Sequence, residues 1–99
     1  MCEQQWYFYL IETKSGSLYT GITTDVSRRF SEHQANGPKT ARSLRGKGPL
    51  TLRFQQRGGD KSNALKLEYR IKRLARPKKL ALIAETITVA QLWPELTPP

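Results

Sequence analysis

Two short apolar segments near the start of the chain alternate with the period of two that is typical of β-strands. Residues 6–11 and 18–22 are rich in aromatic and β-branched side chains, and ETKSGS between them supplies the Ser and Gly of a tight turn. This pattern predicts a hairpin. With the turn centred near Lys14, Tyr9 and Tyr19 are expected to lie opposite each other on adjacent strands.

The segment TTDVSRRFSEHQAN that follows has the spacing of a helix. Thr24 or Asp25 can cap its N-terminus, and the NGP sequence at residues 36–38 ends it. At about 100° per residue, His33 joins the apolar face, and Arg29 lies at the margin of that face one turn earlier. Both side chains are therefore expected at the buried edge of the helix.

Residues 37–48 form a basic segment that contains glycines and lacks periodicity. Such a loop can present amide and cationic donors to phosphate groups. A third strand is expected at 50–55, where alternation places Leu50, Leu52 and Phe54 on one face. The sequence RGGD is then expected to turn the chain.

A second helix is predicted from Asp60 or Ser62 to about Ala75, and Pro77 is expected to end it. Its apolar positions form an arc about 100° wide, and Glu68 projects into or just beside that arc. A carboxylate is costly to bury without a partner, which makes Glu68 the most anomalous residue of the sequence.

The sequence indicates one α/β domain at residues 1–80 and a C-terminal extension at residues 81–99 that is not a separate domain. The expected fold is a small three-stranded, mostly antiparallel sheet flanked by helices. In the extension, LALIAE predicts a short helix, Val89, Leu92 and Trp93 are candidates to dock on the body, and the final TPP is expected to be flexible.

The charge of the chain points to a polyanionic partner. Seventeen Lys and Arg against eight Asp and Glu give a net charge of +9, and the segment 39–79 holds fourteen of the basic residues with only Asp60 and Glu68 as acids. Nucleic acid is favoured over an anionic membrane, because no long basic amphipathic helix carries exposed Trp or Phe.

Several classes of protein and site are excluded at this point. The one cysteine, Cys2, rules out an internal disulfide and a multi-cysteine zinc site. No apolar run approaches the ~20 residues of a membrane span, and no charged-then-apolar leader opens the chain, so a cytoplasmic location is expected. Protein partners are not readable from the sequence.

Each unusual polar residue has an ordinary structural explanation when it is considered alone. Strand tyrosines are common, a single His on an apolar margin is usually a core residue, and Glu68 can pair with Lys72 at i+4. Together, however, hydroxyls, an imidazole, a guanidinium and a carboxylate are the groups that phosphodiester cleavage requires. The spacing alone leaves both interpretations open.

An ordered series of motifs resembles the GIY-YIG nucleases. YFY at 7–9 and YTG at 19–21 resemble the paired motifs that name this family, with Arg29 ten residues after Tyr19, His33 one turn later, and Glu68 in ALKLEYRIKRL on a later helix. The resemblance covers roughly residues 5–80. The short chain and its YTGIT sequence look like the small stand-alone bacterial members.

The resemblance implies hydrolysis of DNA phosphodiesters with one divalent metal, Mg²⁺ or Mn²⁺. It implies that Glu68 is the metal ligand, that Arg29 holds the phosphate, and that Tyr9, Tyr19 and His33 position and deprotonate the attacking water. Which of these three is the general base stays open. RNA is not excluded as a substrate.

The resemblance also implies a surface that binds nucleic acid. Gly21 is expected to let the backbone approach the active face closely. The expected phosphate contacts come from the basic loop and the second helix, and they are Lys39, Arg42, Arg45, Lys47 and Lys72.

The chain departs from the family pattern at two positions, with Ile22 where several members have Lys and Leu80 where they have Asn. Two alternatives to a nuclease therefore stay open. One is a non-catalytic nucleic-acid-binding module, and the other is a protein whose tail from Ile87 to Pro99 docks on a partner.

Overall fold

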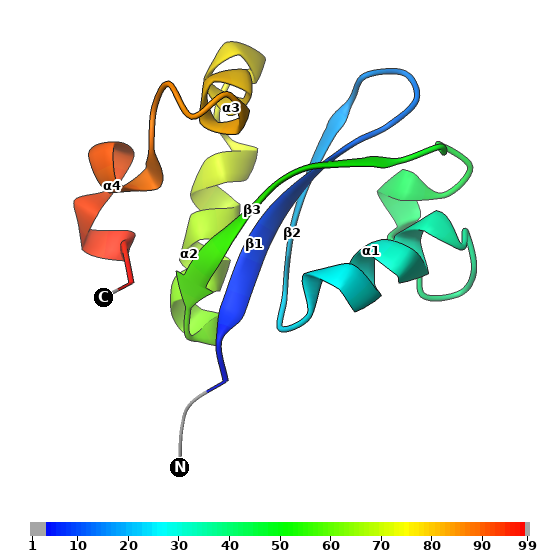
Figure 1. Cartoon of the computed structure of the whole chain (residues 1–99), viewed down its shortest axis with the longest axis horizontal. Coiled ribbons are helices and arrows are strands. Elements are labelled where there is room, and N and C mark those ends of the chain that lie inside the picture. The colour runs from blue at the N-terminus through cyan, green and yellow to red at the C-terminus, as the bar shows by residue number, and fades with distance from the viewer. Residues whose placement is uncertain (1–3, 99) are drawn as a thin grey trace.

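Three antiparallel strands form the sheet at the centre of the molecule, in the order β2-β1-β3 (Figure 1). This computed structural model describes residues 4–98, so Cys2 and the last residue of TPP lie outside the described part of the chain. The expected α/β fold, a small sheet flanked by helices, is confirmed.

The hairpin joins β1 (Trp6–Glu12) to β2 (Leu18–Thr23), but its register differs from the one predicted. Tyr9 pairs with Gly21, and Tyr19 pairs with Ile11. The turn is centred one residue later than expected, with Gly16 at φ +91°. This moves the pairing by two residues, so the prediction that Tyr9 faces Tyr19 directly is wrong, although both remain on one face.

The third strand, β3 (Thr51–Gly59), is longer than predicted and runs through the RGG sequence that was expected to turn. Its pairing with β1 shifts between Leu10, opposite Phe54, and Ile11, opposite Leu52. An extra residue on one strand is a β-bulge, and it reverses the faces beyond it. Leu50 and Leu52 therefore pack on one side of the sheet and Phe54 on the other, contrary to the prediction.

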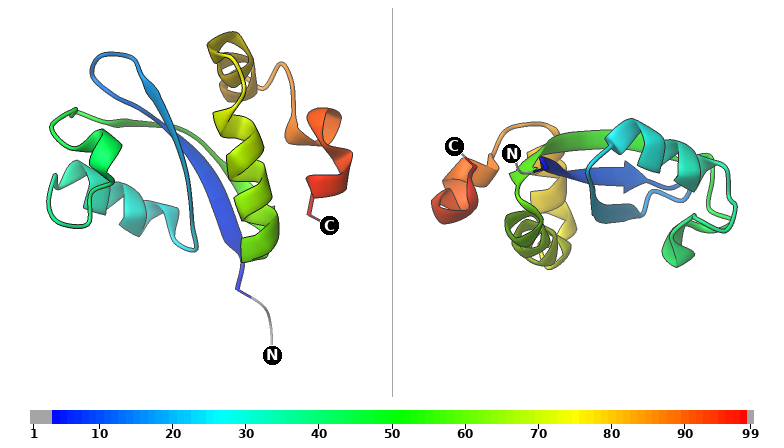
Figure 2. Two further views of the ribbon diagram at one scale, coloured as in Figure 1. Left: turned by 180° about the vertical axis from the view of Figure 1, so that it is seen from behind. Right: turned by 90° about the horizontal axis from the view of Figure 1, so that it is seen from below.

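Helices lie on both faces of the sheet, as the two further views show (Figure 2), and a separate core lies on each face. The α1 core contains α1 (Val26–Gln34) and the odd-numbered side chains of β1, and its buried members are Tyr9, Ile11, Val26, Leu44 and Leu50. The α2 core contains α2 (Lys61–Lys72) and the opposite face, and its buried members are Phe8, Leu10, Leu67, Ile71, Leu82, Val89 and Leu96.

Asx caps begin both principal helices. Asp25 accepts a hydrogen bond from the Arg28 amide at 3.0 Å to start α1, and Asp60 accepts one from the Asn63 amide at 2.8 Å to start α2. After α1, the expected basic loop contains one helical turn, η1 (Arg42–Leu44), whose Leu44 is 2% exposed. That buried leucine fastens the loop to the α1 core.

The second helix ends at Lys72, three residues before the predicted end at Ala75. A new helix, α3 (Arg76–Ile83), starts with Pro77 in its first turn. Proline tolerates that position because the amides of a first turn have no partner within the helix. Pro77 therefore starts one helix rather than ending another.

The C-terminal extension packs against the domain. It contains α4 (Val89–Leu92), which Thr88 and Gln91 cap reciprocally, and η2 (Pro94–Leu96). The expected docking of the tail is seen in Leu92 and Trp93, which pack against the α2 core. The side-chain amide of Asn63 ties the two parts together, because it donates to Gly58 O at 2.8 Å and to Leu96 O at 2.7 Å.

No described helix combines the length and the apolar character needed to cross a bilayer.

Replacing Asn63 by Ala tests how firmly the extension is held. The substitution leaves two partly buried carbonyls without their donor, so we expect the free energy of unfolding to fall by about 1–3 kcal/mol. Amide hydrogen exchange should speed up in residues 89–97. The exposed neighbour Ser62→Ala is the matched control, and equal behaviour of the two variants would show that the tail does not depend on Asn63.

Candidate active site

Three rings from three elements meet on the α1 side of the sheet. Tyr9 of β1 and Tyr19 of β2 lie diagonally, with ring centroids 6.3 Å apart. The imidazole of His33 on α1 lies 6.1 Å from the ring of Tyr9 and 5.6 Å from that of Tyr19, measured between centroids. The structure thus brings together three of the residues that the sequence singled out.

Gly21 makes this arrangement possible because the ring of its strand partner Tyr9 lies over it. A Cβ on residue 21 would stand 2.4 Å from the Tyr9 hydroxyl and 2.6 Å from its Cζ. Distances that short are forbidden to any side chain. The predicted close approach at Gly21 is made by Tyr9, and whether a substrate also uses it stays a prediction.

The hydrogen bonds of His33 define which of its nitrogens carries the proton. The Ala41 amide donates to Nδ1 at 3.2 Å, so that nitrogen is an acceptor. The neutral ring then carries its hydrogen on Nε2, which lies 3.1 Å from the Tyr9 hydroxyl oxygen and donates to it. His33 is 1% exposed, and burial together with the charge of Arg29 lowers its pKa, which keeps the ring neutral.

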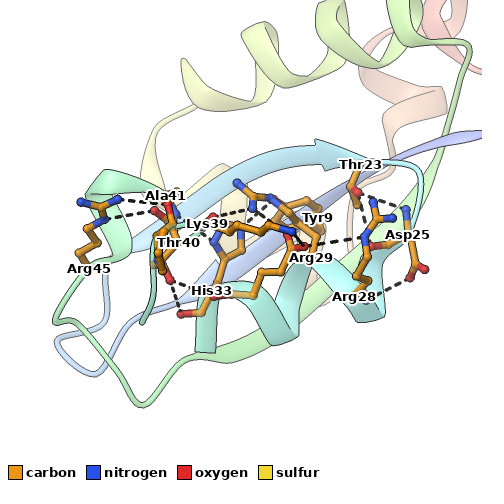
Figure 3. Close-up of polar contacts among 12 residues, drawn as sticks. Tyr9, Thr23, Asp25, Arg28, Arg29, His33, Lys39, Thr40, Ala41 and Arg45 are labelled. Carbon is orange, nitrogen blue, oxygen red and sulfur yellow. Dashed lines mark hydrogen bonds and ion pairs between the residues drawn. The ribbon is translucent and has the colours of Figure 1, made fainter. Parts of the chain in front are cut away.

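The segment 39–41 is hydrogen-bonded to residues of α1 and fixes the orientation of the His33 ring (Figure 3). The Thr40 hydroxyl, 3% exposed, donates to Glu32 O at 2.9 Å, and Arg29 donates to Lys39 O at 2.6 Å. Sequence reasoning missed Thr40 and Ala41. A backbone amide has no residue-type signal, and the only sign of Thr40 in the sequence was a hydroxyl residue within a basic loop.

Arg29 occupies the predicted margin of α1, with 28% of its side chain exposed. Partial burial opposes its charge, but the hydrogen bond to Glu32 at 2.9 Å and the nearby Tyr9 outweigh that effect and raise the pKa of the guanidinium. The side chain is a fixed cation beside the phenols.

Both phenols are held in the neutral form. Burial, and then the proximity of Tyr19, raise the pKa of Tyr9, while the positive charge of Arg29 acts in the opposite direction. Burial also raises the pKa of Tyr19, and the negative charge of Glu68 adds to the increase while Arg29 again opposes it. Additional positive charge, such as that of a bound cation, is therefore needed before either phenol can ionise at neutral pH.

Glu68 approaches the same place from the α2 side of the sheet. Its negative charge raises the pKa of the Tyr19 phenol, and Tyr19 lies on β2, an edge strand of the sheet. The Glu68 side chain is 21% exposed, and Lys72 Nζ lies 3.6 Å from its Oε2. The ion pair with Lys72, which is the ordinary structural explanation of Glu68, is thus present. It does not exclude a role in the site, because the charge of Glu68 also acts on Tyr19.

The donor set fits a metal ion that depends on its substrate. Within residues 4–98, no three His, Cys, Asp or Glu side chains gather into a group that could hold a metal. Mg²⁺ usually keeps several waters and takes one or two carboxylates together with substrate phosphates. One partly exposed carboxylate from Glu68 meets that requirement only when a phosphate completes the site.

The five candidate phosphate contacts have different surroundings. Lys39 is largely solvated, with 78% of its side chain exposed, and Lys72 is 52% exposed while paired with Glu68. Arg42 and Lys47 are exposed. Arg45 donates to Thr40 O at 3.4 Å and to Pro38 O at 3.3 Å, so it also braces the loop.

Known proteins are similar to this chain in sequence. The family model of the GIY-YIG catalytic domain matches residues 5–81. A UPF0213 protein of Sodalis glossinidius (strain morsitans) is 57% identical over 84 residues, which cover 85% of this chain and 77% of that protein. A UPF0213 protein of Photorhabdus laumondii is 53% identical over 92 residues, which cover 92% of this chain and 86% of that protein.

A solved structure agrees with these matches. The solution NMR structure of a UPF0213 protein from Bacillus halodurans is 41% identical and superposes with a TM-score of 0.52. The match covers 82% of this chain and 84% of that one. The resemblance read from the motif series, including the likeness to small bacterial members, is confirmed.

Gly21→Ala tests the contact on which the rings depend. The added Cβ forces the Tyr9 ring out of its place, so we expect a loss of about 1–3 kcal/mol in the free energy of unfolding, measured with urea. In a Tyr9→Ala background the same change should cost much less. Gly37→Ala, where a Cβ meets nothing within 4 Å, is the matched control.

The lowered pKa of His33 predicts a pH dependence of stability. The unfolded chain binds the proton more readily, so the contribution of His33 is complete above its ordinary pKa of about 6.5 and is lost as the pH falls toward the lowered folded value. From about pH 7.5 to about pH 5.5, the free energy of unfolding should fall more for the wild type than for His33→Gln. Parallel curves would contradict the lowered pKa of His33.

Proposed function

Because the chain belongs to the GIY-YIG catalytic domain family, we propose that it is a metal-dependent endonuclease that hydrolyses DNA phosphodiester bonds. One observation carries the proposal. Tyr9, Tyr19 and His33 meet beside Arg29, and the charge of Glu68, from a different helix, acts on the phenol of Tyr19. A role in DNA repair or processing is part of this proposal.

The hydrogen bonds favour Tyr9 as the group that takes the proton from water. His33 is already a donor through Nε2, and its Nδ1 faces the Ala41 amide, so neither nitrogen is free to accept. A Tyr9 phenolate, in contrast, would receive the Nε2 hydrogen bond and the positive charge of Arg29. Tyr19 lies nearer to the negative charge of Glu68, which disfavours its ionisation.

Arg29 suits the role of holding the phosphate. Its Nη1 is committed to Glu32 and to Lys39 O, which fixes the orientation of the guanidinium. A guanidinium has five N–H donors, so further donors remain for a phosphate oxygen, on which negative charge increases in the transition state.

Glu68 is the residue that would hold the divalent ion, Mg²⁺ or Mn²⁺. The ion, when bound with the substrate, stabilises charge on the phosphate oxygens and on the leaving group. Lys72 must then release the carboxylate, and its ammonium, which is already half exposed, is free to turn to the backbone of the nucleic acid.

The basic segments around the site favour a polyanion and supply the affinity. The loop at 37–48 and the helices α2 and α3 carry most of the positive charge of the chain. Charge of this kind attracts DNA and RNA alike, so the preference for DNA rests on the family and is tested with both.

Replacing Glu68 by Gln tests the proposal directly. We expect cleavage of labelled DNA in Mg²⁺ or Mn²⁺ to fall by about two orders of magnitude or more, since the carboxylate that holds the ion is lost. Binding of the same DNA in EDTA should be retained. Arg29→Ala should also abolish cleavage.

Glu95→Gln is the matched control, because Glu95 is an exposed acid that pairs with Arg70 outside the site. Cleavage at the wild-type rate by Glu68→Gln would refute the proposal. A wild-type protein that binds DNA with a steep salt dependence and never cuts any strand would establish the binding module instead.

A further inference from the structure

Helix α2 carries two large apolar side chains that the fold does not cover. Among the described residues, the exposed large hydrophobic side chains are Leu65 at 45%, Tyr69 at 62% and Leu80 at 39%. Leu65 and Tyr69 are four residues apart, so they lie one above the other on the same face of α2. A pair of this kind is unusual on a helix whose other outward residues are mostly basic.

This pair lies on the same helix as the candidate catalytic acid. Leu67 and Ile71 are fully buried and define the inner face of α2. At about 100° per residue, Glu68 lies at the margin of that face, and Lys72, Leu65 and Tyr69 follow it, in that order, round the helix toward the outer surface. Leu65 and Tyr69 therefore lie within one helical turn of Glu68 along the axis of α2, on the solvent side of Lys72.

The surroundings of Tyr69 suit a nucleobase. The guanidinium of Arg73 lies 5.3 Å from the centroid of the Tyr69 ring and covers part of it. Lys66 and Lys72 are also exposed on α2, and Lys72 is at i+3 from Tyr69. An exposed aromatic among cations matches a nucleotide, because the ring can stack on the base while the cations meet its phosphates.

We propose that Leu65 and Tyr69 form a stacking platform for an unpaired base next to the bond that is cut. The inference rests on the proposed nuclease function and adds a substrate class to it. Bases inside a duplex are stacked on each other and cannot reach a helix surface, so a platform beside Glu68 selects single-stranded or locally opened nucleic acid.

Charge complementarity favours an unpaired base of a nucleic acid over a protein partner on this platform. Glu68 is the only acid among residues 61–84, whereas α2 and α3 carry several Lys and Arg. An apolar patch of two side chains within such a field is small for a protein interface. It is well matched to one base, whose face is about as large as the phenol ring.

The test compares single-stranded and duplex DNA of one sequence in EDTA, so that binding is measured without cleavage. The variant Tyr69→Ser should weaken binding of the single strand by about tenfold and leave duplex binding unchanged, since one stacked base is lost. Tyr69→Phe should bind like the wild type. With Tyr69→Ser, a 2-aminopurine in the single strand should lose the fluorescence quenching that stacking on Tyr69 causes in the wild type.

Leu80→Ser is the matched control, because Leu80 is an exposed apolar residue on α3 outside the platform. Equal losses on single strand and duplex, or the same loss with Leu80→Ser, would overturn the platform. So would unchanged binding by Tyr69→Ser. Strand preference without any cleavage in Mg²⁺ would instead refute only the nuclease proposal, and cleavage without the preference would refute only the platform.

Discussion

The site depends on one contact, the passage of the Tyr9 ring over Gly21. The two residues are partners across the hairpin, and the phenol fills the space where any side chain at position 21 would stand. The ring can therefore reach across β2, where its hydroxyl meets His33 Nε2 at 3.1 Å. Tyr19, two positions along the same strand, then lies beside both rings. A different residue at position 21 would displace the phenol that the surrounding groups contact.

That contact links parts of the chain that are distant in sequence. His33 keeps its orientation because the Ala41 amide holds Nδ1, and Ala41 is held because the Thr40 hydroxyl is bonded to the last turn of α1. The hairpin, α1 and the basic loop thus act as one unit on the α1 side. The acid comes from α2, on the other side of the sheet, and its charge acts on Tyr19 of the edge strand β2. The candidate site lies at the boundary between the two cores, where polar groups can be half-buried and still reach solvent.

The electrostatics of this boundary fit a site that is completed only when its substrate binds. Both phenols have raised pKa values, and the charge of Glu68, which has Lys72 as its partner, acts on Tyr19. Under the proposed function, nucleic acid would bring phosphates that replace the carboxylate as the partner of Lys72 and complete the coordination of a hard cation. The proton, the ion and the phosphate would then be coupled, because each would change the charge that the other two experience.

The sequence by itself determined the element types, the shared face of Tyr9 and Tyr19, and the marginal position of Arg29 and His33, because alternation and helical period are local properties. It also identified Glu68 as misplaced for a simple surface helix. Only the tertiary structure decided the hairpin register, the bulge that separates Leu52 from Phe54, and the start of α3 at Pro77. Those features follow from pairing and packing between distant segments. The role of the Ala41 amide was invisible for the same reason, since every residue other than proline has one and only the fold directs it at an imidazole.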